Sequence, residues 1–413
     1  MQLTDEEQAM LAGEFGEPRR IAIEQQIKVG NFFDAEDFVP VTQAHIMADT
    51  ESLGATGVQW LESLVAHGPE ACRVRVPTIT DPRGLDFCTY KQLKQTEEWA
   101  ELESRTIDAM RTMGILMTDT CINYQTISPP VRGEHLAFGD TGVVIYSNGV
   151  LGARSNFEGG PAAVTAALTG RTPRYGLHLD RQRIGTMLFE LEFRPRTLSD
   201  WGALGGLVGR HAGSYWQVPV INGVVGSPTS DELKHFGAAL ASYGSVPMFH
   251  MVGVTPEAPD RKGCFDGPIP QAIRLSAKDL DAFYDGFGRH PEQVDVVVFA
   301  APQLSIIEIQ QLADKIQGRH IHPDTALLVA TSPENKTAAD RMGFTQTLED
   351  AGAIVMKGVC FYQMHAREMG EANGWTRLMT NSAKLANIIS GYGYQPVLAN
   401  MDACLDAAVA GKY

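Results

Sequence analysis

The last third of the sequence alternates short aliphatic runs with amphipathic stretches, and this pattern restricts the fold more than any other feature. Residues 294–300 read Val-Asp-Val-Val-Val-Phe-Ala, and residues 326–330 and 354–356 are two further runs of this kind. Each run precedes a helix-compatible stretch, such as 306–316. Buried strands that alternate with helices form a parallel sheet with helices on both faces. The sequence therefore predicts an α/β fold with a doubly wound parallel sheet in its C-terminal part.

Ligands of doubly wound sheets bind at the carboxyl ends of the strands. The segments that follow the three aliphatic runs are 301–305, 331–335 and 357–360. We therefore expect these segments to be loops that lie side by side on one functional edge of the sheet.

The N-terminal part of the sequence carries helix signals instead. Thr4 and Glu7 form a capping-box pattern before an apolar stretch, and a second helix is expected over 18–30, between a proline and a glycine. A third helix is expected over 97–113, which has an apolar face. The glycine-rich stretch 202–213 is not spaced like a dinucleotide-binding fingerprint, so we interpret it as close packing between segments of the chain.

Charge and cysteine usage exclude several classes of protein. The formal net charge of −15 argues against a nucleic-acid surface, which needs clustered Lys and Arg. We see no signal peptide, and no apolar run approaches the roughly 18 residues of a membrane helix. The scattered cysteines are typical of a reducing cytoplasm, with free thiols or metal ligands. They are Cys72, Cys88, Cys121, Cys264, Cys360 and Cys404.

Several longer motifs stand out when they are read together. Residues 120–124 read Thr-Cys-Ile-Asn-Tyr, and residues 133–140 read Gly-Glu-His-Leu-Ala-Phe-Gly-Asp. Residues 148–161 read Asn-Gly-Val-Leu-Gly-Ala-Arg-Ser-Asn-Phe-Glu-Gly-Gly-Pro, and Thr-Asn-Ser-Ala-Lys follows at 380–384. Together they resemble the signature of the aconitase X family, in its large subunit, and the resemblance covers nearly the whole chain.

The resemblance implies an aconitase-like fold and the activity of a dehydratase, a hydro-lyase. Bacterial members of the family act on cis-3-hydroxy-L-proline, and archaeal members act on mevalonate 5-phosphate. A small swivelling domain completes the site, and here the sequence stops at Tyr413, directly after the large-subunit ending. The resemblance therefore implies a separate small subunit and a heterodimer.

The length of 413 residues suggests two or three domains. We expect residues 1–200 to form a helical N-terminal region together with the glycine-rich signature domain of the family. Residues 201–413 are then the α/β domain.

The resemblance also implies an iron–sulfur site. Members of the family take cluster ligands from three elements, and Cys121 and Cys360 match the first and third of them. The second, often Cys-Pro-His, reads Ala-Pro-Gln here, so that Ala301 stands where a cysteine is expected. A [2Fe–2S] cluster, a substitute ligand such as Cys264, or a mononuclear metal remain open, and the alternative is that both thiols are structural.

Dehydration removes a weakly acidic proton beside a carboxylate and expels hydroxide, so it needs a base and help for the leaving group. By the resemblance, Ser382 is the base. Lys384 can help by lowering the pKa of the serine hydroxyl. The alternative for Ser382 is a helix N-cap.

The expected substrate-binding residues lie in the signature motif and near the N-terminus. Asn156, Glu158 and Gly159 resemble substrate-binding groups, and Arg154 can pair with a carboxylate in a bidentate manner. The alternative for Arg154 is an internal salt bridge. His45 lies in an element that forms a substrate loop in the family, although a lone histidine is more often structural.

We expect the protein to dehydrate cis-3-hydroxy-L-proline to Δ1-pyrroline-2-carboxylate, because the missing middle cysteine, at Ala301, departs from a full three-cysteine site. The alternative substrate is mevalonate 5-phosphate, whose phosphate Arg171, Arg174 and Arg183 can bind. A member that binds a metabolite without catalysis is a third possibility.

Overall fold

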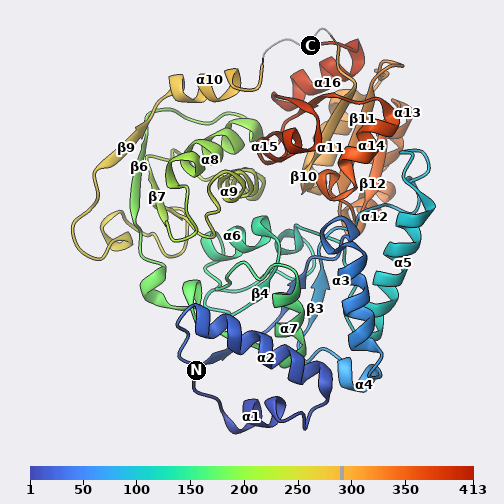
Figure 1. The fold of residues 1–413 in the computed structure, drawn as a ribbon. Helices are drawn as coiled ribbons and strands as arrows, with labels where there is room; N and C mark the ends of the chain where they lie inside the picture. The colour runs from blue at the N-terminus through green and yellow to red at the C-terminus, as the bar shows by residue number, and fades with distance from the viewer. Residues whose placement is uncertain (289–292) are drawn as a thin grey trace.

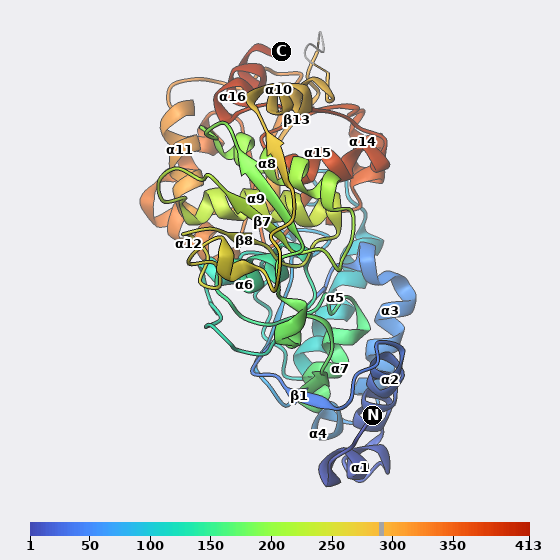
Figure 2. The same ribbon diagram turned by 90° about the vertical axis from the view of Figure 1, so that its left-hand side faces the viewer.

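The computed structural model describes residues 1–288 and 293–413, which form three regions, each built around a parallel sheet. Figure 1 shows the first region in blue and green, the second in green and yellow, and the third in orange and red. In Figure 2 the first region lies below the other two, with the N-terminal helices at its far end. Among the described residues, none of the helices has the length and apolar character needed to cross a bilayer.

The first region holds the three-stranded parallel sheet β3-β2-β4 and a small antiparallel pair, β1 and β5. Its strands are β1 (Phe38–Pro40), β2 (Ala44–Ile46), β3 (Thr78–Thr80), β4 (Ala137–Phe138) and β5 (Arg171–Pro173). Its helices are α1 (Asp5–Leu11), α2 (Glu17–Phe32), α3 (Thr50–Val65), α4 (Pro69–Cys72), α5 (Glu97–Thr112), α6 (Thr141–Gly149) and α7 (Pro161–Thr169).

The helix signals of the N-terminal part are confirmed. The side chain of Thr4 accepts a hydrogen bond from the backbone N–H of Glu7, and the side chain of Glu7 accepts one from the backbone N–H of Thr4. This capping box starts α1. Helix α5 covers the expected stretch, and α2 continues two residues beyond Gly30 to Phe32.

The second region holds the parallel sheet β8-β7-β6-β9. Its strands are β6 (Met187–Leu191), β7 (Pro219–Asn222), β8 (His250–Met251) and β9 (Ala272–Leu275), and its helices are α8 (Leu198–Ala212), α9 (Ser230–Gly244) and α10 (Ala277–Asp285). A Cβ atom on Gly205 of α8 would lie 2.1 Å from the carbonyl oxygen of Phe236 in α9. The glycines of α8 therefore serve close helix packing, as the sequence predicts.

The third region confirms the predicted doubly wound sheet. All five strands are parallel, in the order β12-β11-β10-β13-β14. The strands are β10 (Val296–Leu304), β11 (Ala326–Thr331), β12 (Ile354–Lys357), β13 (Arg377–Thr380) and β14 (Gln395–Leu398). The helices are α11 (Ile306–Ile316), α12 (Pro333–Met342), α13 (Phe344–Asp350), α14 (Ala366–Asn373), α15 (Ala383–Ile389) and α16 (Met401–Ala410).

Alternation along β10 explains why this strand is apolar on both sides. Val297 and Phe299 pack into one hydrophobic cluster with side chains such as Leu312 of α11. Val296 and Val298 pack into a second cluster on the opposite face. Successive residues of a strand point to opposite faces, so a sheet covered by helices on both sides needs a continuous apolar run.

Two of the loops expected at this edge are not loops. Residues 331–335 hold the last residue of β11 and the first turn of α12, with Ser332 as the helix cap between them. Residues 301–304 are not a loop, because β10 continues to Leu304, which pairs with Thr331 of β11 after an irregularity in register. The left-handed backbone of Ala301, with a φ of 53°, lies within that irregularity. The strand ends where Ser305 caps α11.

Candidate active site

The two cysteines singled out from the sequence are neighbours in the structure, at the carboxyl edge of the third sheet. Cys121 lies in a segment that runs beside β3, and Cys360 follows β12. Both thiols are buried. The pKa of Cys121 is raised well above its usual range, first by its hydrogen bond with the Cys360 side chain, and then by burial and by the charges of Asp81 and Asp140.

Buried carboxyl groups surround this thiol pair. Asp81 follows β3, and its Oδ2 accepts a hydrogen bond of 2.8 Å from Nε2 of Gln363, which also donates to Asp49 over 3.2 Å. Burial, and then the charge of Asp140, raise the pKa of Asp81 well above its usual range, while burial raises the pKa of Asp49 to about 6. The Oδ1 atom of Asp81 is buried and has no hydrogen-bond partner among the described residues.

Lys384 supplies a buried cation to the same cluster. Its Nζ lies 3.5 Å from Oδ1 of Asp140, and 5.4 Å from the centre of the Tyr362 ring. Burial lowers the pKa of Lys384, but the charge of Asp140, followed by those of both cysteines and Asp81, more than offsets burial and raises it. The lysine is therefore held as a cation among groups that can carry negative charge.

Ser382 lies at the N-terminus of α15 and has the geometry of an N-cap. Its Oγ accepts a hydrogen bond of 3.1 Å from the backbone N–H of Leu385 and donates to the carbonyl oxygen of Ala301. The capping alternative is therefore present in the structure. The same oxygen would take the proton if Ser382 acted as the base, so the predicted catalytic role and the capping role fall on one atom.

His45 is fully buried at the edge of the cluster. Its Nε2 lies 2.9 Å from the carbonyl oxygen of Thr120 and 3.6 Å from Oδ1 of Asp81. Burial lowers the pKa of the imidazole, so we assign the neutral form with the proton on Nε2, directed at Thr120. Nδ1 is then an acceptor, and it has no partner among the described residues.

The other predicted substrate-binding residues make their side-chain contacts with residues outside the thiol cluster. Arg154 forms an ion pair with Asp180, which is the internal salt bridge left open as its alternative. Asn156 donates to the carbonyl oxygen of Tyr175 and accepts from the hydroxyl of Tyr215, which follows α8 in the second region. Gly159 is exposed, with open space where a Cβ atom would stand.

Glu158 should make the protein less stable as the pH rises. Burial raises the pKa of its carboxyl from 4.5 to about 7, against the opposing effect of the hydrogen bond from Thr172. A carboxyl with a raised pKa contributes stability that is fully present below pH 4.5 and is lost as the pH rises through about 7. In Glu158→Gln, the slope of the unfolding free energy against pH should therefore be less steep over this window. The difference should correspond to about one bound proton. Urea unfolding at several pH values checks this; parallel curves would contradict it.

The residues around the thiols do not fit a cluster held by three cysteines. Ala301 has no donor atom, and Cys264 lies in a separate hydrophobic cluster, where its thiol donates to a backbone carbonyl. Within residues 1–288 and 293–413, no three His, Cys, Asp or Glu side chains are arranged to hold a metal ion. A [2Fe–2S] cluster with Cys121 and Cys360 among its ligands stays a prediction.

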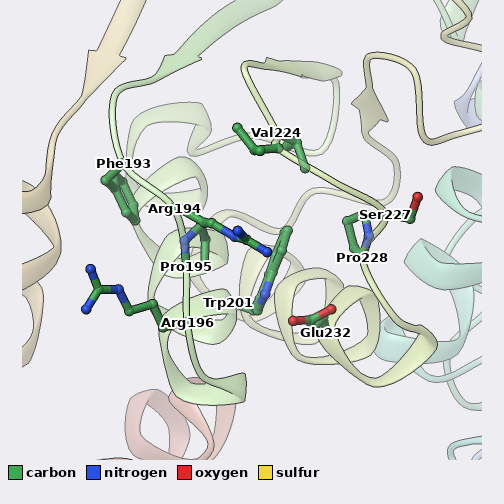
Figure 3. A pocket seen from close by; sticks show the side chains of 10 residues that line it. Phe193, Arg194, Pro195, Arg196, Trp201, Val224, Ser227, Pro228 and Glu232 are labelled. Carbon is green, nitrogen blue, oxygen red and sulfur yellow. The ribbon is translucent and has the colours of Figure 1, made fainter.

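A separate pocket of about 450 Å³ lies in the second region, near the carboxyl ends of β6 and β7. Figure 3 shows Arg194 reaching toward Trp201 there, with Glu232 on the far side of the indole. None of the predicted site residues lines this pocket. The buried cluster around the thiols is therefore the better candidate for the chemistry.

The sequence did not single out several members of the cluster. Asp81 and Asp140 each follow a strand of the first region, and Asp140 also caps α6 through a hydrogen bond to the N–H of Val143. The signal available in the sequence was an acidic residue one or two positions after a short run of β-branched or apolar residues. Tyr362 and Gln303 carry no such signal, because their roles depend on contacts with distant segments.

Family models match the chain from one end to the other. They are the aconitase X first domain over residues 1–181, the second domain over 185–285 and the third domain over 294–410. These ranges follow the three sheets described above.

Individual relatives agree with the family models. The chain is 33% identical over 416 residues to a phosphomevalonate dehydratase large subunit of Methanosarcina mazei, covering 100% of this chain and 98% of the relative. It is 34% identical to a cis-3-hydroxy-L-proline dehydratase of Pseudomonas aeruginosa, covering 98% of this chain and 70% of the relative. The solved aconitase X of Thermococcus kodakaraensis, in its holo-form, matches with a TM-score of 0.88, 28% identity and coverage of 99% and 100%. The chain therefore belongs to the aconitase X family of dehydratases.

Proposed function

We propose that this protein dehydrates cis-3-hydroxy-L-proline to Δ1-pyrroline-2-carboxylate. The observation that carries the proposal is the acidic character of the buried cluster. Asp49, Asp81 and Asp140 lie around the thiols, with one buried lysine beside them. The ring nitrogen of hydroxyproline is a cation at neutral pH, and the buried carboxyl groups of this cluster can accept hydrogen bonds from its N–H donors.

The arginines that could bind a phosphate are already engaged. Arg171 pairs with Glu6 and Glu7, and Arg174 pairs with Asp37. Arg183 is buried and forms an ion pair with Glu257. A dianionic phosphate would have to compete with these carboxylates, so the arrangement favours a substrate without a phosphate group.

The reaction takes the α-proton from C2 of the ring and releases the 3-hydroxyl group as water, which leaves a C2=C3 enamine. A proton then leaves the nitrogen and one adds to C3, which gives the C=N bond of Δ1-pyrroline-2-carboxylate. In the proposed roles, Ser382 first releases its hydroxyl proton to solvent and then accepts the α-proton as an alkoxide, which returns it to the neutral hydroxyl. The N–H of Leu385 and the N-terminus of α15 stabilise the negative charge of the alkoxide before this transfer. Lys384 stabilises negative charge that develops on the substrate carboxylate as the proton leaves. The neutral carboxyl of Asp81 can give a proton to the departing hydroxyl.

The second candidate is dehydration of mevalonate 5-phosphate. It is favoured by coverage, because the chain spans 98% of the M. mazei phosphomevalonate dehydratase large subunit but 70% of the P. aeruginosa hydroxyproline enzyme. The M. mazei relative is named a large subunit, which supports a second, smaller chain as its partner. We therefore propose that a separate small subunit completes the enzyme.

The test compares kcat/KM for the two substrates, with the chain and its small subunit co-expressed and purified without oxygen. We expect turnover of cis-3-hydroxy-L-proline and none of mevalonate 5-phosphate. The reverse preference would assign the second candidate, and turnover of neither would leave only membership of the family.

A further inference from the structure

A single buried side chain, that of Gln303, connects the loops around the thiol pair. Its Oε1 accepts a hydrogen bond of 3.3 Å from the backbone N–H of Cys121. Its Nε2 donates to the carbonyl oxygens of Asp119, Val359 and Thr331 over 3.1, 3.1 and 3.2 Å. Two amide hydrogens therefore serve three carbonyl groups, one on each of three separate segments.

These contacts lie directly beside the two thiols. Val359 immediately precedes Cys360, and Asp119 precedes Cys121 by two residues. The backbone N–H of Gln303 also donates to Sγ of Cys121 over 3.5 Å. The segment of each cysteine is thus tied to the same glutamine, which fixes one segment relative to the other.

Gln303 is itself held in place. Its side chain is fully buried, and its carbonyl oxygen accepts a hydrogen bond of 3.2 Å from Nζ of Lys234, which forms a buried ion pair with Glu308. Two residues earlier, the carbonyl oxygen of Ala301 accepts a hydrogen bond from the hydroxyl of Ser382. An amide anchored on both sides can transmit its position to the loops that it contacts.

We propose that Gln303 is a positioning residue that holds Cys121 and Cys360 side by side. The strand end that carries Ala301 in place of a metal ligand then contributes a hydrogen-bonding clamp instead. The proposal concerns the same site as the proposed function, but its test uses no substrate, so either can fail while the other stands.

The test measures capture of phenylarsine oxide by the reduced, metal-free full chain. Trivalent arsenic forms a bond to each of two adjacent thiols, its oxygen leaves as water, and no electrons are transferred. Gln303→Met keeps the size of the side chain but removes all of its amide hydrogen bonds. We expect its affinity for the arsenical to fall by about 10-fold to 100-fold, as for other changes to residues that orient ligands. Cys360→Ser defines the background without a thiol pair.

Gln95→Met is the matched control. The Gln95 amide is also buried, and its Nε2 donates to the carbonyl oxygens of Gly84 and Met364 over 2.9 Å each. Both of these residues are four positions away from the nearest cysteine in the sequence. Gln95→Met should lose stability but keep wild-type affinity for the arsenical. Equal losses in both variants would overturn the proposal, as would wild-type affinity in Gln303→Met.

A second variant, Gln303→Asn, separates an effect on thiol positions from a failure to fold. It keeps a polar amide but shortens its reach by one methylene group, so it should also lose affinity while it still unfolds cooperatively on heating. If neither variant at this position folds, Gln303 is a determinant of folding rather than of thiol positions, and the proposal is overturned.

Discussion

Replacing Lys384 with methionine is expected to reduce kcat/KM for dehydration by roughly 10²–10³-fold. The lysine Nζ lies 3.5 Å from Oδ1 of Asp140 and interacts electrostatically with both buried thiols, so its loss removes the cation that offsets the negative charge of the cluster. Removal of one partner from a buried ion pair also costs about 3–5 kcal/mol of stability. Steady-state kinetics of the complex and urea unfolding of the same preparation measure both effects.

Arg183→Met separates the two effects. Arg183 is another buried cation with a carboxylate partner, Glu257, and its guanidinium also donates to the carbonyl oxygens of Leu177 and Asn148, away from the thiol cluster. This variant should lose stability and keep the wild-type kcat/KM. If Lys384→Met also kept wild-type kinetics, the assignment of the cluster as the active site would be wrong.

Replacing Cys121 or Cys360 with serine is expected to lower turnover by more than about 100-fold, the upper end of what changes outside the ligand shell cost. A serine hydroxyl neither ionises at neutral pH nor binds iron as a thiolate does. The double variant should be no slower than either single variant, because residues that act as a unit are not additive. Turnover by the purified complex measures all three.

Cys264→Ser is the control for the cysteine variants. Its thiol is buried in the second region among Leu188, Val220 and Ala258, away from the thiol pair. Cys264→Ser therefore removes a buried sulfur atom, as the other two variants do, but leaves the thiol pair unchanged. Loss of turnover in Cys264→Ser would show that this cysteine replaces the ligand missing at Ala301.

The C-terminal fold was predictable because a sheet covered on both faces leaves a continuous apolar signal. The runs at 294–300, 326–330 and 354–356 correspond to β10, β11 and β12. The end of β10 was not predictable, because a proline after Ala301 reads as a turn, while pairing of Leu304 with β11 extends the strand. The division of the chain near residue 200 stays a prediction.

The site was predictable only in part. Motif resemblance selected Cys121, Cys360 and Lys384, and the fold brings these three together. The ion pair of Arg154 with Asp180 joins residues that are 26 positions apart in the sequence, so no local sequence pattern predicts it. The same reason applies to Gln303, whose partners lie up to 184 residues away.

The proposed activity is tested most directly by NMR identification of the product after the anaerobic complex is incubated with cis-3-hydroxy-L-proline. We expect Δ1-pyrroline-2-carboxylate in an amount equal to the hydroxyproline consumed, and none with Cys121→Ser or Lys384→Met. Unchanged hydroxyproline, in a preparation that dehydrates mevalonate 5-phosphate, would contradict the proposed activity.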